Sequence, residues 1–158
     1  MNNIDNDSSY YLEGNIGSGE TCEYVSTNAQ NHLLVSGEGM PDDSGYFLAE
    51  QDPSNENNWA FKDTASEQYL TRDEANGNAQ CTSTVPVYFV TVNADGGDDV
   101  FNISQETQDG DQLYLSMLNT EVGSQITFAE YKDEDQSKQK WKFVKKKGVR
   151  DVPGGYGG

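Results

Sequence analysis

Two groups of polar and aromatic residues have the side chains that bind sugars. Carboxylate and amide groups take hydrogen bonds from sugar hydroxyls, and an aromatic face covers the C–H side of the ring. The larger group lies in the last third of the chain and comprises Asn119, Tyr131, Asp133, Asp135 and Gln139. The smaller group comprises Asp42 and Asp43, followed by Tyr46. We expect both groups on loops, where binding residues tend to lie.

Residues for catalysis are not evident. The chain has no nucleophile motif, no Gly-rich phosphate loop and no Cys/His cluster. Its only histidine, His32, lies in a short apolar run, which favours a structural role over that of a general base. A pair of carboxylates can hydrolyse glycosides, but 27 acidic residues in a chain of 158 form such pairs by chance. The sequence therefore predicts a non-catalytic protein.

Three acidic turns are candidates for calcium binding: residues 95–99, 109–111 and 133–135. Calcium takes roughly six to eight oxygen ligands, which such turns can supply. None of the three follows the EF-hand pattern, and Asp and Gly are also the ordinary residues of tight turns. We therefore expect plain turns, no metal site and no cofactor.

The charge balance excludes some partners. Ten basic residues against 27 acidic ones give a net charge of −17. A field of that sign repels phosphate backbones and anionic membranes, so we expect no nucleic-acid partner and no membrane binding. No apolar run approaches the roughly 18 residues of a membrane helix. The first residues lack a signal-peptide pattern, so the chain as written is expected in the cytoplasm, unless a leader was removed or export is unconventional.

The two cysteines, Cys22 and Cys81, lack the spacing of a zinc site. In a chain without a leader, such cysteines are most often buried free thiols. A disulfide between Cys22 and Cys81 is the alternative, and the sequence does not decide between the two.

The sequence contains a threefold internal repeat. Tyr24, Tyr69 and Tyr114 are separated by 45 residues each, and each is followed by Val or Leu and then by Ser or Thr. A pair of apolar residues two positions apart precedes each tyrosine: Tyr10 and Leu12, Trp59 and Phe61, Phe101 and Ile103. Spacing of two is typical of β-strands. We expect Tyr24, Tyr69, Tyr114, Trp59, Phe101 and Trp141 to be the recurring core residues.

Each copy contains four expected strands. The third strands lie near residues 32–37, 79–85 and 124–131, and the fourth near 46–51, 87–93 and 140–146. Residues 63–75 taken alone could also form a helix, since Phe61, Ala65 and Tyr69 share helical spacing. The sister copies carry Gly at that point, so the repeat favours a strand.

Three units of four strands imply one closed structure. A four-strand unit cannot bury its apolar face alone, but three units around a pseudo-threefold axis close a barrel without exposed edges. The plan resembles the β-trefoil, an all-β fold of twelve strands in three repeats of about 45 residues. We expect a single domain at residues 10–147, with repeats at roughly 10–52, 53–96 and 97–147. Residues 1–9 are expected to be a flexible lead-in and 148–158 a flexible Gly-rich tail.

Two trefoil families offer closer comparisons. The middle copy resembles fascin-like repeats at residues 69–71, 77–78, 81, 85–86, 89 and 95–96. That resemblance implies a cytoskeletal, actin-binding or other protein-binding module. The third copy carries Gln139-Lys140-Trp141, which is similar to the Gln-x-Trp motif of ricin-type lectins. The Asp that such lectins need on the second strand is replaced by Ser or Thr in all three copies, so their sugar site does not carry over.

The leading functional prediction is a non-catalytic, lectin-like carbohydrate-binding module that uses loop carboxylates, amides and aromatics. The expected partner is a glycan or, in the fascin-like alternative, a protein such as actin. Like-charge repulsion counts against acidic actin. Two further alternatives are a protease inhibitor that uses the loop at residues 40–45 and a structural or matrix protein.

Overall fold

Twelve β-strands, four from each predicted repeat, make up the fold. The computed structural model describes residues 4–14, 23–28, 30–38, 46–83, 89–97, 100–119 and 121–145. The strands are β1 (Ser9–Gly14), β2 (Glu23–Thr27), β3 (Leu34–Glu38), β4 (Phe47–Asp52), β5 (Asn55–Asp63), β6 (Tyr69–Arg72), β7 (Ala79–Thr82), β8 (Val90–Gly97), β9 (Val100–Glu106), β10 (Gln112–Ser116), β11 (Thr127–Ala129) and β12 (Trp141–Lys145). Each lies within or beside its predicted segment, which confirms the predicted strand order.

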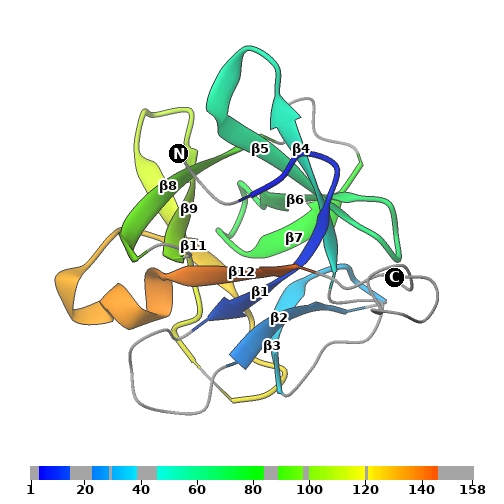
Figure 1. Cartoon of the computed structure of the whole chain (residues 1–158). Helices are drawn as coiled ribbons and strands as arrows, with labels where there is room; N and C mark the ends of the chain where they lie inside the picture. Colours follow the sequence, from blue (N-terminus) through cyan, green and yellow to red (C-terminus); the bar gives the residue numbers. More distant parts are fainter. Residues whose placement is uncertain are drawn as a thin grey trace.

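Six of the strands form a closed ring. β1 pairs with β4 and β12, β5 pairs with β4 and β8, and β9 pairs with β8 and β12, all antiparallel. Closure leaves none of these six strands with an unpaired edge. The β4–β5 and β8–β9 hairpins extend away from the body of the ring (Figure 1).

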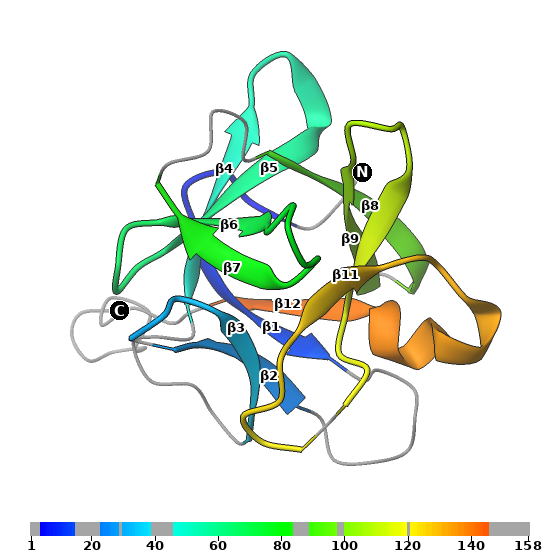
Figure 2. The ribbon, with the colours of Figure 1, turned by 180° about the vertical axis from the view of Figure 1, so that it is seen from behind.

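The other six strands form three hairpins that cover one end of the ring. These are β2–β3, β6–β7 and β10–β11. Isolated bridges join them pairwise, between Leu33 and Gln80, Val35 and Gln125, and Asn78 and Thr127. Figure 2 shows β3, β7 and β11 arranged around one centre. The bridges give the three repeats equivalent places around a pseudo-threefold axis.

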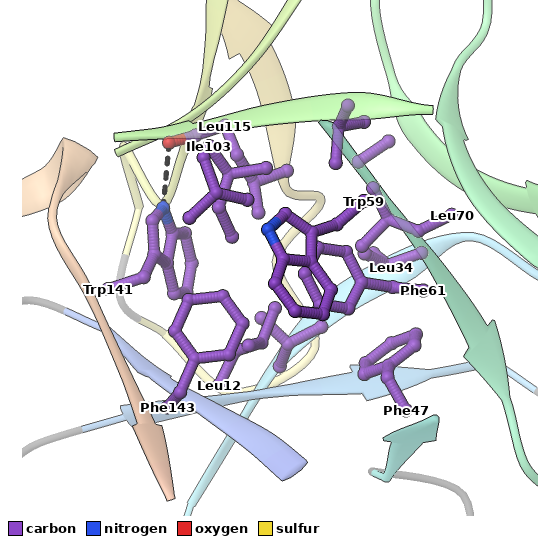
Figure 3. Close-up of a cluster of buried hydrophobic side chains, with 14 of the residues drawn as sticks. Leu12, Leu34, Phe47, Trp59, Phe61, Leu70, Ile103, Leu115, Trp141 and Phe143 are labelled. Atoms are coloured by element: carbon purple, nitrogen blue, oxygen red, sulfur yellow. Dashed lines mark hydrogen bonds between the residues drawn. The ribbon is translucent and has the colours of Figure 1, made fainter. Parts of the chain in front are cut away.

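Large apolar side chains from every repeat meet inside the ring (Figure 3). Trp59, Phe101 and Trp141 are buried there, as predicted. The indole N–H of Trp141 donates to the carbonyl oxygen of Leu115 at 2.9 Å, so this ring is buried with its polar atom satisfied. Burying side chains of this size contributes about 1.5–3 kcal/mol each, and these contacts stabilise the closed ring.

The prediction that the repeated tyrosines are core residues is wrong. Tyr24, Tyr69 and Tyr114 are half-buried. Side chains alternate along a strand, so the next residue in each repeat faces the core instead. Those residues are Val25, Leu70 and Leu115, all fully buried. The tyrosine rings cover the outer side of the hairpins, where the Tyr69 hydroxyl donates to the Glu50 carboxylate at 2.9 Å.

The segment with helical spacing in the second repeat forms a turn followed by β6, so the strand expectation for it is confirmed. A 3-10 helix, η2 (Asp133–Gln139), occupies the third acidic turn and was not predicted. No helix in the described ranges is long and apolar enough to cross a membrane.

The lead-in to β1 is packed rather than loose from Ile4 onward. Ile4 is buried in the core, and the backbone N–H of Asp7 donates to the Ala49 carbonyl at 2.7 Å. The Lys145 ammonium lies 3.2 Å from the Asp5 carboxylate. The burial of Ile4 is the physical reason that this segment departs from the expected flexibility. The expected tail at residues 148–158 lies outside the described residues.

Candidate ligand-binding cleft

A cleft of about 730 Å³ lies where the second repeat meets the third. Its lining comes from β5, β6 and the turn after it, β7, β8, and the end of β9, and these strands can be followed in Figure 2. The polar residues that line it are Asn58, Thr71, Arg72, Asp73, Glu74, Gln80, Thr91, Gln105, Glu106 and Gln108. Phe89 is the one aromatic residue among the lining side chains.

Gln105 joins the two repeats across this cleft. Its Oε1 accepts a hydrogen bond from the Arg72 backbone N–H at 3.0 Å. Its Nε2 lies 3.4 Å from the Phe89 carbonyl oxygen, and the Thr71 hydroxyl lies 3.3 Å from both ends of the amide. Gln105 therefore fixes the backbone that presents Arg72 and Phe89 to the cleft.

The end of β6 carries Arg72, and the turn that follows carries the acidic residues Asp73 and Glu74. Asp73 Oδ1 accepts the Ala75 backbone N–H at 2.9 Å, and the Asp73 carbonyl accepts the Gly77 N–H at 2.7 Å. Gly77 has a φ of 79°, a conformation that residues with a side chain rarely adopt. Asp, Asn and Gly at these positions are the residue types that such a turn requires.

Arg72 lines the cleft together with three acidic residues, Asp73, Glu74 and Glu106. In the described part of the chain, no acidic side chain forms an ion pair with Arg72. Glu74 and Glu106 are exposed, whereas Arg72 is half-buried. The five N–H donors of a guanidinium are thus available to a solute in the cleft.

The cleft combines hydrogen-bond donors, hydrogen-bond acceptors and one aromatic ring. None of its lining residues is His, Cys or Lys. This arrangement suits reversible binding of a small solute that carries many hydroxyl groups.

The predicted ligand-binding residues of the third repeat do not line this cleft. Asn119 is exposed, and its Oδ1 accepts the backbone N–H of Glu121 at 2.9 Å. Tyr131 is 41% exposed and meets the ring of Tyr114 edge-on, with centroids 5.6 Å apart. Asp133 is exposed at the start of η2, and Asp135 lies within that helix. Asp42 and Asp43 lie outside the described residues.

Gln139 is not a ligand-binding residue. Its side chain is 0% exposed. Its Nε2 donates to the Ser116 hydroxyl at 3.0 Å and to the Glu130 carbonyl at 2.8 Å, and its Oε1 accepts the Lys132 backbone N–H at 3.2 Å. Gln139 therefore fastens the end of η2 to β10 and cannot reach a solute at the surface.

Other candidate residues have structural surroundings. Cys81 is a buried free thiol, and Cys22 lies outside the described residues. Burial raises the pKa of the Cys81 thiol far above its ordinary value, and the nearby Asp63 carboxylate adds to the effect. His32 is half-buried in a left-handed backbone conformation, with a φ of 62°. Among the described residues, no group of three or more His, Cys, Asp or Glu side chains is placed to hold a metal ion.

Comparison with known proteins identifies the architecture. No family model and no curated protein matches the chain. A ricin B-like lectin of Macrolepiota procera, solved in complex with lactose, superimposes with a TM-score of 0.71 at 12% identity, over 90% of this chain and 99% of the lectin. The Rhizoctonia solani agglutinin gives a TM-score of 0.66 at 16% identity, over 92% of this chain and 100% of the agglutinin. The fold is a β-trefoil.

The β-trefoil also occurs as one part of larger proteins. A mosquitocidal holotoxin matches with a TM-score of 0.76 at 11% identity, over 95% of this chain. This chain spans only 18% of the holotoxin's length. At these identities the likeness is one of fold alone, and the fascin-like and ricin-type resemblances of individual repeats stay predictions.

One feature of the sequence indicates where the cleft lies. Arg72 is the only basic residue between Lys62 and Lys132. It follows Tyr69 by three positions, and the residues three positions after Tyr24 and Tyr114 are Thr27 and Met117, both buried. The second repeat of the β-trefoil thus departs from its sisters at the place where the cleft lies.

Proposed function

We propose that this β-trefoil is a non-catalytic carbohydrate-binding module and that the cleft around Arg72 is its glycan site. The observation that carries the proposal is the lining of the cleft. It brings amides, carboxylates, a guanidinium and an aromatic side chain into one space of about 730 Å³. These groups can form hydrogen bonds with the hydroxyls of a sugar and can cover the C–H side of its ring.

Each class of lining residue has a role in the proposal. Asn58, Gln80 and Gln108 carry amides, which both donate and accept hydrogen bonds and therefore match a hydroxyl in either orientation. Arg72 donates, and Glu106 accepts. Phe89 offers an apolar surface for the C–H side of the ring. Because each net hydrogen bond contributes only about 0.5–1.5 kcal/mol, several together give binding in the roughly millimolar to micromolar range for one sugar unit.

The comparison with lectins supports this use of the fold. The Macrolepiota procera protein is a lectin that was solved with lactose, and this chain covers nearly its whole length. The support is one of analogy, because a shared fold does not transfer a site. The proposal therefore rests on the lining of the cleft.

A glycan array tests the proposal directly. Labelled protein is applied to the array, and any glycan that gives a signal is then titrated against the wild-type protein and two variants. Arg72→Ala removes the central donor of the cleft, and Asn119→Ala is the matched control at an exposed position of the third repeat. We expect binding that Arg72→Ala weakens and Asn119→Ala leaves unchanged. A blank array at high protein concentration would overturn the proposal.

A further inference from the structure

The cleft is negatively charged although it contains Arg72. Asp73, Glu74 and Glu106 line it, so three carboxylates accompany one guanidinium. Asp109 and Asp111 lie on the exposed turn that follows β9, next to the lining residue Gln108. That turn is closed by hydrogen bonds from the Thr107 N–H to the Asp111 carbonyl at 2.8 Å and from the Gly110 N–H to the Thr107 carbonyl at 3.0 Å. The acidic groups are therefore held beside the cleft.

The rest of the molecule reinforces this negative field. The net charge of the chain is −17, and eight of its ten basic residues lie at or after Lys132. An excess of negative charge in a cleft raises the local concentration of positively charged ligands. A sugar that bears a carboxylate or sulfate is repelled, and a neutral sugar gains nothing from the field. A sugar that bears a positive charge gains most.

We propose that the preferred ligand of the cleft is a glycan of amino sugars whose amines are free and protonated. This inference rests on the carbohydrate-binding function proposed above and specifies its ligand class. The ammonium groups pair with carboxylates of the cleft, foremost Glu106, which lies at the exposed end of β9. The hydroxyl groups of the sugar form hydrogen bonds with the amides of the cleft and with the guanidinium of Arg72.

The lining distinguishes an amino sugar from a basic peptide. The charged groups of a lysine-rich peptide are ammonium ions at the ends of long side chains, which pair with carboxylates and carry no hydroxyl groups. An amino sugar carries hydroxyls next to each ammonium group, so it uses Arg72 and the amides of Asn58 and Gln80 as well. The mixed lining therefore favours the sugar.

Calorimetric titration with two matched oligosaccharides tests the inference. One is a β-1,4-linked tetramer of glucosamine, and the other is the same tetramer with every amine acetylated. We expect the free-amine tetramer to bind more tightly, and to bind more weakly at about 0.15 M salt than at about 0.01 M, because salt screens exposed charges. Glu106→Gln should weaken its binding about 2- to 5-fold at low salt. Glu130→Gln, a matched change at an exposed site outside the cleft, should leave binding unchanged.

Three results would overturn the inference. Equal or tighter binding of the acetylated tetramer would show that the amines are not recognised, while the carbohydrate-binding function would stand. Binding of tetralysine as tight as that of the free-amine tetramer, with the same loss in Glu106→Gln, would show that the cleft selects charge alone. Failure of both tetramers to bind would show that amino sugars are not the ligand. The glycan array would then decide separately whether the cleft binds another sugar.

Discussion

Gln105 and Arg72 are joined across the boundary between two repeats: the side-chain Oε1 of Gln105 accepts the backbone N–H of Arg72 at 3.0 Å. The two residues are 33 positions apart in the chain, and closure of the ring brings them together. The same amide reaches Thr71 and the carbonyl of Phe89. The shape of the cleft therefore depends on a side chain that need not touch the ligand.

Replacing Gln105 should affect both stability and binding. Gln105→Ala leaves the Arg72 N–H and the Thr71 hydroxyl without this partner, and we expect a loss of about 1–3 kcal/mol in the free energy of unfolding. The affinity for the glycan should fall as well, because the Arg72 backbone is no longer held. Denaturant titration and calorimetry measure the two effects. Gln108→Ala changes an exposed amide of the same cleft and should leave stability unchanged; equal destabilisation by both variants would contradict this role of Gln105.

Replacing Gln139 should lower stability without changing the affinity for the glycan. Gln139→Ala removes three hydrogen bonds from a fully buried amide that fastens η2 to β10, and we expect a loss of about 1–3 kcal/mol in the free energy of unfolding. Glycan affinity, measured below the unfolding transition, should stay at the wild-type value. A folded Gln139→Ala protein that had lost glycan binding would place the site in the third repeat instead.

The Cys81 thiol makes stability depend on pH in the alkaline range. Burial raises its pKa in the folded state, so the thiol stays protonated there while the unfolded chain ionises above about pH 8.5. Its contribution to stability is complete below that pH and is lost as pH rises, with a slope of up to about 1.4 kcal/mol per pH unit.

Denaturant titrations between pH 7 and 10 measure this slope. The comparison is between Cys22→Ser and Cys22→Ser/Cys81→Ala, so that only the buried thiol differs. We expect a shallower decline in the double variant. Identical slopes, or rapid alkylation of Cys81 in the native protein at pH 8, would contradict the buried position of the thiol.

Much of the fold could be predicted from the sequence because its signals are local and repeated. The spacing of Tyr24, Tyr69 and Tyr114 gave the repeat, and alternation of apolar residues gave the strands. The alternation did not extend to Gln139, because this residue ends the 3-10 helix η2 and lies before the strand that begins at Trp141. Gln139, the first residue of the Gln-x-Trp pattern, was predicted to bind a ligand, whereas its side chain has a structural role.

The cleft could not be predicted in the same way. Its walls come from two repeats, and no local pattern indicates that Gln105 meets Arg72 rather than another residue. The three repeats also differ in sequence at a position that lines the cleft. Arg72 stands where its sisters are the buried Thr27 and Met117, so the pseudo-symmetry that predicts the strands does not predict the site.

The most direct test of the account is the affinity of an array-selected glycan for Arg72→Ala, measured beside Asn119→Ala. Loss of hydrogen bonds to a charged donor costs about 1.5–3 kcal/mol, so we predict roughly a 10- to 100-fold weaker binding in Arg72→Ala. Asn119→Ala should bind like the wild-type protein. Unchanged binding in Arg72→Ala together with a loss in Asn119→Ala would contradict the account and would locate the glycan on the loops of the third repeat.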